Sequence, residues 1–124
     1  MAPTATTSPA ETLPKAARVR KRGEFLAIQN GGKRFPTRHF LLVYRPARGT
    51  QARLGITVTK KIGGAVIRNR VKRAVRETFR RVRTGLDPID LVVIARKGSG
   101  ALDGATIRAE IEPALATLGG GRPA

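Results

Sequence analysis

The chain has 124 residues, which suits a single domain, and its 25 lysine and arginine residues against 8 aspartate and glutamate residues give a net charge of +17. It contains no cysteine, which excludes disulfides and thiolate metal sites, and no apolar run approaches the roughly 20 residues that a membrane span needs. The first residues lack the features of a signal peptide, so we expect a cytoplasmic protein with an anionic partner, nucleic acid being favoured over an acidic membrane surface.

The N-terminal half predicts a tail, a short helix and two or three strands. Residues 1–12 are rich in alanine, proline, threonine and serine, a composition typical of a disordered tail. Residues 23–30 predict a short helix that the following glycine pair ends. Residues 38–45 and 53–59 predict strands, and the second of these alternates apolar with other side chains. Residues 33–35 are a candidate for one further short strand.

The C-terminal half predicts two helices around one strand. Residues 60–65 form a glycine-rich connector that leads into a long helix over residues 66–83. Residues 90–96 predict a buried strand, because they are apolar without clean alternation. The last helix is predicted over residues 103–118, with its first aspartate as the N-cap, and Pro113 should kink or split it. Together these elements predict a mixed sandwich: one small sheet with helices packed on it.

The long helix has two chemically different faces. On a helical wheel one face is apolar and is expected to pack on the core: Ile67, Val71, Ala74, Val75, Thr78, Phe79 and Val82. The opposite face is a basic stripe that carries Asn69, Lys72, Arg73, Arg76, Arg80 and Arg83, with Arg68 and Arg70 at its two borders. Cations four residues apart repel each other and destabilise a helix, so the stripe favours a bound polyanion over simple solvation.

The sequence from Arg53 to Phe79 reads RLGITVTKKIGGAVIRNRVKRAVRETF and resembles the signature of the bacterial ribonuclease P protein family. In that signature a strand ends in a lysine pair, a glycine loop follows, and a helix opens with Arg-Asn-Arg and continues with Lys-Arg. The matching residues are Lys60, Lys61, Gly63, Ala65, Val66, Arg68, Asn69, Arg70, Lys72 and Arg73. The resemblance covers most of residues 13–118, which we take as one domain, and residues 119–124 are expected to be a flexible C-terminus.

This resemblance implies both a fold and a function. The implied fold is an α+β sandwich, with a four-stranded sheet, three helices and a left-handed β-α-β crossover around the helix that carries Arg68. The implied function is that of an RNA-binding subunit of ribonuclease P, which assists the catalytic RNA in endonucleolytic removal of the 5′ leader from precursor tRNA. The expected partners are that catalytic RNA and the precursor tRNA leader, with no membrane. The expected cofactor is Mg²⁺, bound mainly by the RNA subunit.

Two groups of residues are candidate RNA contacts. The group expected to bind the catalytic RNA is Lys60, Lys61, Arg68, Asn69, Arg70, Lys72, Arg73, Arg76 and Arg80. The group expected to bind the leader is Arg18, Phe25, Phe40 and Arg53, and the resemblance implies a cleft between the first helix and the sheet. Single-stranded RNA needs cations and flat surfaces. The sequence leaves open whether Phe25 and Phe40 line this cleft or belong to the core. Gln29, one helical turn after Phe25, stands where the family often has an aromatic residue.

No residue is expected to be catalytic or to bind a metal. His39, the only histidine, lies in a predicted strand and is read as structural or as a phosphate contact, and the few acids show no paired spacing for acid/base chemistry. Two other classes of protein stay open. A structural RNA binder, such as a ribosomal protein, would share the charge. A basic helix for membrane surfaces would need exposed apolar residues, whereas Ile67, Val71 and Val75 are typical of a core face.

Overall fold

The computed structural model describes residues 17–19, 21–47, 52–82 and 88–120. The predicted N-terminal tail and the last four residues of the predicted flexible end therefore lie outside the described residues. The four strands are β1 (Lys33–Pro36), β2 (Phe40–Pro46), β3 (Arg53–Thr57) and β4 (Ile89–Ala95). The helices are α2 (Arg22–Gly31), α3 (Ala65–Val82) and α4 (Gly104–Leu115), with a 3-10 turn η4 (Ser99–Ala101) and a π-helical turn η5 (Ala116–Gly120).

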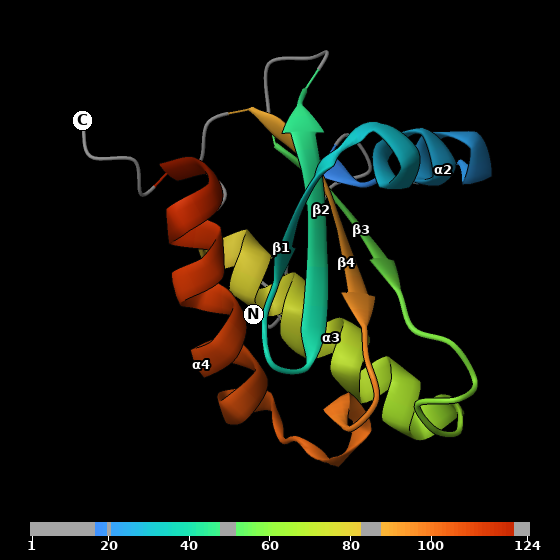
Figure 1. Cartoon of the computed structure of the whole chain (residues 1–124). Helices are drawn as coiled ribbons and strands as arrows, with labels where there is room; N and C mark the ends of the chain where they lie inside the picture. Colours follow the sequence, from blue (N-terminus) through green and yellow to red (C-terminus); the bar gives the residue numbers. More distant parts are fainter. Residues whose placement is uncertain (1–16, 20, 48–51, 83–87, 121–124) are drawn as a thin grey trace, which may run out of the picture.

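The strands form one mixed sheet in the order β1-β2-β4-β3. β2 pairs antiparallel with β1 and with β4, whereas β3 and β4 are parallel and are joined through α3. Figure 1 shows both parallel strands in front of α3, which makes this crossover left-handed. Almost all β-α-β connections have the opposite hand. The predicted fold class is confirmed, including the four strands and three α-helices among the described residues.

Helices cover both faces of the sheet (Figure 1). α3 and α4 cover one face, where the larger core includes Phe40, Leu42 and Phe79. α2 lies on the other face, over a smaller core that includes Ile28 and Val43. Because successive strand residues point to opposite faces, β2 supplies Leu42 to one core and Val43 to the other. The sheet is therefore a partition between two apolar layers of unequal size.

The last helix follows its predicted start and changes form near its end. The side chain of Asp103 accepts a hydrogen bond from the backbone N–H of Thr106 at 2.8 Å, which confirms the predicted N-cap. Pro113 lies inside α4, and the helix takes π-type hydrogen bonding from Ala116 onward. The hydroxyl of Thr117 donates to the carbonyl of Pro113 at 3.0 Å across this junction. The predicted interruption is therefore a change of helix type rather than a break into two helices.

Candidate nucleic-acid interface

The basic stripe of α3 faces away from the larger core. Val71, Val75 and Phe79 are fully buried on the core side. The predicted RNA-contacting residues of this helix are exposed or half-buried: Arg68, Asn69, Arg70, Lys72, Arg73, Arg76 and Arg80. Within the described ranges, no carboxylate lies within ion-pair distance of these cations, and the one acid of the helix, Glu77, pairs instead with Arg108 of α4 at 3.9 Å. In the part of the chain that the structure describes, the stripe is therefore a cationic surface without ion pairs of its own.

The crowding of like charges extends from α3 to the segment before α2. Desolvation first, and then the neighbouring guanidinium groups of Arg18 and Arg73, lower the pKa of Arg76. Cations packed this closely repel one another, and an oxyanion bound between them would reduce that repulsion. Arg18 and Arg76 together thus form a cationic surface whose charge suits a phosphate group.

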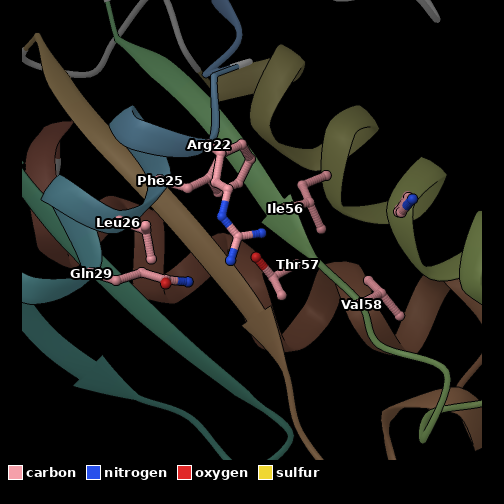
Figure 2. Close-up of a pocket in the computed structure, with 8 residues that line it drawn as sticks. Arg22, Phe25, Leu26, Gln29, Ile56, Thr57 and Val58 are labelled. Carbon is pink, nitrogen blue, oxygen red and sulfur yellow. The ribbon is translucent and has the colours of Figure 1, made fainter.

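A groove runs between α2 and α3 along β3, which is an edge strand of the sheet. Its wider part has a volume of about 530 Å³ and its narrower part about 110 Å³, and Phe25, Ile56 and Lys72 line both. Figure 2 shows the wider part, where Arg22 extends from α2 toward Thr57 and Gln29 points into the same space from α2. The groove thus combines a cationic wall from α3, a polar and apolar wall from α2 and a floor made by a strand.

One end of this groove is closed by residues 17–19, which run beside β3. The N–H of Val19 donates to the carbonyl of Leu54 at 2.8 Å, and Arg18 pairs in parallel with Leu54. This pairing buries Val19 and brings Arg18 to the rim of the narrow part of the groove. Beyond Leu54 the described residues supply no further partner for the edge of β3. The groove is consequently open where β3 passes Lys72.

Phe25 rests directly on the backbone of β3 because residue 55 is glycine. A Cβ atom at Gly55 would lie 2.7 Å from Cε1 and 2.8 Å from Cζ of the Phe25 ring, closer than side chains approach each other. The φ angle of Gly55 is negative, so the glycine is required for space and not for an unusual backbone conformation. A glycine in a strand interior often marks such a close approach. The half-buried ring of Phe25 thereby becomes part of the groove wall.

Arg53 joins α2 to the sheet through two carboxylates, in what we call the Glu24–Arg53–Asp90 bridge. Its Nε and NH2 donate to the two oxygens of Asp90 at 2.8 and 3.0 Å, and its NH1 donates to Glu24 of α2 at 3.2 Å. The hydrogen bond to Asp90 is the main cause that raises the pKa of Arg53. Asp90 is fully buried, and Arg45 lies 3.6 Å from it on the other side. The buried carboxylate is therefore compensated by two arginines.

The structure places only some of the four residues predicted to contact the leader in the groove. Arg18 and Phe25 line the groove, and their contact with a leader stays a prediction. The prediction for Phe40 is wrong, because its side chain has no exposed surface and lies in the core beneath α3 and α4. Arg53 is not among the lining residues, and three of its guanidinium N–H groups are already hydrogen-bonded. The sequence reasoning missed Gly55, whose position inside a strand was the available signal.

The loop before α3 carries the remaining predicted contacts. Lys60 and Lys61 are exposed at a turn in which the N–H of Gly63 donates to the carbonyl of Lys60 at 3.2 Å. Lys61 and Lys97 lie at a separate cavity of about 350 Å³ near the end of β4. Arg70 donates from NH2 to the carbonyl of Gly100 at 2.6 Å, so one side of its guanidinium is fixed. These cations continue the charged surface of α3 around its N-terminal end.

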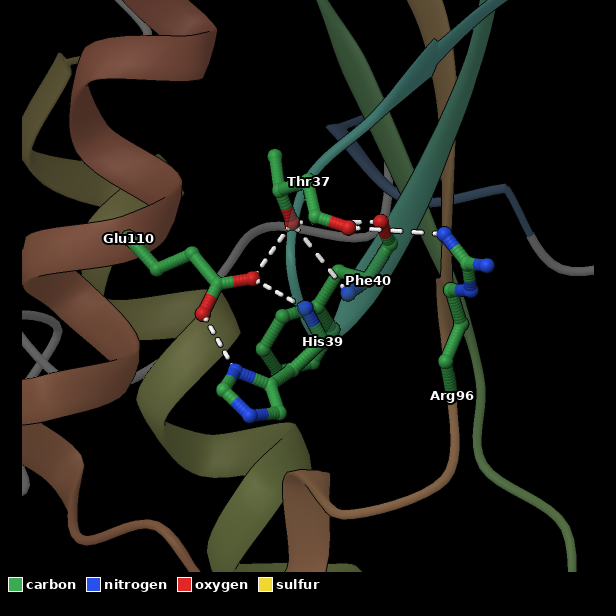
Figure 3. A network of polar contacts seen from close by, with 5 residues as sticks. All are labelled: Thr37, His39, Phe40, Arg96 and Glu110. Atoms are coloured by element: carbon green, nitrogen blue, oxygen red, sulfur yellow. Dashed lines mark hydrogen bonds and ion pairs between the residues drawn. The ribbon is translucent and has the colours of Figure 1, made fainter.

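His39 belongs to a network of polar contacts, shown in Figure 3, that joins it to α4. Its Nδ1 and its backbone N–H contact Glu110 of α4 at 2.8 and 2.6 Å, and the hydroxyl of Thr37 donates to the same carboxylate. Burial alone would raise the pKa of Glu110, but the hydrogen bonds from Thr37 and His39 outweigh it and lower that pKa. The network attaches the turn between β1 and β2 to α4, which supports the structural reading of His39.

The described residues hold no metal-binding cluster and no membrane-spanning helix. Nowhere in these ranges do three histidine or acidic side chains gather closely enough to hold a metal ion together. Within the same ranges, no helix combines the length and the apolar character needed to cross a bilayer.

Comparisons with known proteins point to one family. The family model described as Ribonuclease P matches residues 13–119. The ribonuclease P protein component of Citrifermentans bemidjiense is 39% identical over 106 residues, which cover 86% of this chain and 91% of the relative. That of Desulfatibacillum aliphaticivorans is 52% identical over 84 residues, covering 67% and 71%.

Solved structures agree with the sequence comparison. The RNase P protein of Staphylococcus aureus superimposes with a TM-score of 0.78 at 34% identity, over 83% of this chain and 95% of that one. The RNase P protein of Thermotoga maritima gives a TM-score of 0.75 at 36% identity, over 83% and 98%. The described fold is thus shared along nearly the whole length of these proteins.

Proposed function

This chain belongs to the ribonuclease P protein family, whose members are components of a ribonuclease that includes an RNA subunit, and on that premise we propose that it binds both the RNA subunit and the 5′ leader of precursor tRNA. The observation that carries the proposal is the groove between α2 and α3. It offers one aromatic ring, Phe25, beside four cations, Arg18, Arg22, Lys72 and Arg76. A single-stranded RNA needs this combination of stacking surface and phosphate-binding charge.

The exposed stripe of α3 is the proposed contact with the RNA subunit. Arg68, Arg70, Arg73 and Arg80 project from a helix whose other face is buried, so they can meet RNA without disturbing the core. Arginine forms paired hydrogen bonds with phosphate oxygens, and the absence of carboxylate partners among the described residues leaves these groups available. Lys72 belongs to the stripe and also lines the groove, so it can reach either RNA.

In this proposal the RNA subunit carries out the catalytic chemistry. The described carboxylates form no metal cluster, and the one histidine is engaged with Glu110, so the protein supplies affinity and orientation for the substrate. Mg²⁺ bound mainly by the RNA subunit would supply the metal chemistry of phosphodiester cleavage. The protein's contribution is then measured as binding of precursor tRNA in excess of binding of mature tRNA.

The test is a Phe25→Ala variant in the holoenzyme reconstituted with its RNA subunit. Loss of one stacking surface should weaken precursor tRNA binding by about 1–3 kcal/mol, while the affinities for mature tRNA and for the RNA subunit stay nearly unchanged. Ala27, which is exposed on the same helix, provides the control variant Ala27→Ser. Equal losses for precursor and mature tRNA would refute a role for Phe25 in leader binding.

A further inference from the structure

The Glu24–Arg53–Asp90 bridge determines where α2 lies above the sheet. Arg53 is held edge-on by both oxygens of Asp90, which is buried in β4, so its guanidinium plane has a fixed orientation. The remaining arm reaches Glu24 in the first turn of α2 at 3.2 Å. Only the planar, forked guanidinium can bond two carboxylates in this way, because a lysine ammonium lacks the fork.

The residue after Glu24 is Phe25, the aromatic side chain of the groove. A contact that fixes Glu24 therefore also fixes the height of the Phe25 ring over β3, where the ring already touches the backbone of Gly55. The opposite wall belongs to α3, and its Lys72 lines both parts of the groove. Moving the first turn of α2 would change the width between Phe25 and Lys72.

We propose that Arg53 is a positioning residue, which sets the width of the leader groove by holding α2 through Glu24. This inference rests on the proposed function, because it explains how the groove is kept open for an RNA strand. It replaces the expectation that Arg53 contacts the leader itself. Glu24 then contributes to RNA binding although it carries a negative charge beside a surface that binds a polyanion.

The direction in which the affinity for precursor tRNA changes when Glu24 is removed distinguishes a positioning role of Glu24 from a purely electrostatic one. Removing a carboxylate from a cationic surface strengthens its attraction for RNA through the field alone. Removing the carboxylate that positions α2 should instead weaken leader binding. Glu77 provides the matched control, since it is an acid of similar side-chain exposure, 42% against 37% for Glu24, and its ion pair with Arg108 lies between α3 and α4.

The experiment compares Glu24→Ala and Glu77→Ala in the reconstituted holoenzyme, with binding of precursor and mature tRNA measured for each. Each variant removes one carboxylate, so the change in net charge is the same. Glu24→Ala should bind precursor tRNA about two- to fivefold more weakly, the range expected for a partly exposed ion pair, with mature tRNA unaffected. Glu77→Ala should bind precursor tRNA as tightly as the unmodified protein, or more tightly. Glu24→Gln, whose amide oxygen still accepts from Arg53, should recover part of the affinity.

Three further measurements keep the outcomes distinct. Circular dichroism and the thermal midpoint establish that both variants fold, and the NMR shift of the Gly55 amide reports whether the Phe25 ring has moved. Precursor binding that is unchanged or tighter in Glu24→Ala would overturn the inference, as would equal losses for precursor and mature tRNA. If the unmodified protein itself fails to favour precursor over mature tRNA, the proposed function fails instead.

Discussion

Replacing Gly55 by alanine should displace the Phe25 ring from the groove. The new Cβ would lie 2.7 Å from the ring, whereas ordinary contacts are 3.4–4 Å, so the ring must move by roughly 1 Å or rotate away. Overpacking of this kind costs about 1–3 kcal/mol. We expect the lower end of that range, because Phe25 is only half-buried and can turn toward solvent.

The larger effect should fall on substrate binding. If the displaced ring no longer stacks on a base of the leader, precursor tRNA should bind more weakly by about 1–3 kcal/mol, or roughly 5- to 150-fold. Binding of mature tRNA should stay close to normal. The assay is equilibrium binding of both tRNAs to the reconstituted holoenzyme, and Gly23→Ala is the control, because a Cβ at Gly23 on α2 meets nothing within 4 Å.

A double variant decides whether the mechanism is correct. In a Phe25→Ala background the clash with the ring is gone, and the nearest remaining obstacle is the milder contact with Cβ of Val19 at 3.1 Å. Gly55→Ala should then add little to the loss of affinity already caused by Phe25→Ala, which is the non-additivity expected of directly contacting residues. Losses that add in full, or a single Gly55→Ala variant with normal precursor affinity, would refute the reasoning.

Two other predictions concern the stripe and the network of Glu110. A double Arg68→Ala and Arg70→Ala variant should bind the RNA subunit more weakly. The slope of the logarithm of affinity against the logarithm of salt concentration should fall by about 0.7–0.9 for each phosphate that the protein no longer neutralises. Titrations at several salt concentrations measure this slope, and an unchanged slope would exclude this face of α3 as the contact. The lowered pKa of Glu110 means that its carboxylate stabilises the fold above its ordinary pKa, and that this stabilisation disappears as the pH falls through the lowered value. Urea unfolding should therefore show Glu110→Gln less stable by about 1 kcal/mol at pH 7, with the gap closing as the pH falls below the ordinary pKa of a glutamate; a gap independent of pH would contradict this.

The elements and the faces of α3 could be predicted because their signals are local. A glycine pair marks the end of α2 and a proline the end of β2, and the helical wheel separated Val71 and Phe79 from the arginines of the stripe. Alternation in β2 also placed Phe40 and Leu42 on one side of the strand. It could not say which side α3 and α4 cover, because Leu41 and Val43 on the other side are equally apolar and pack near α2. The misplacement of Phe40 follows from that ambiguity.

The bridge could not be predicted for a different reason. Arg53 and Asp90 meet only because β3 and β4 pair in parallel with these two residues in register. A parallel register between strands separated by a whole helix depends on packing over the full sheet, and no local pattern specifies it. From the sequence, Arg53 was one more arginine in a basic chain, and Asp90 was one of few acids without an evident partner.

The parallel pairing of β3 with β4 also has a consequence for how the molecule assembles. Arg53 and Asp90 are 37 positions apart in the chain, and α3 must be placed behind the sheet before the two strands can meet. Contacts that close so long a loop carry an entropic cost that neighbouring hairpin strands, such as β1 and β2, avoid. The groove, which needs β3, α2 and α3 together, is completed only after the most distant parts of the sheet have joined.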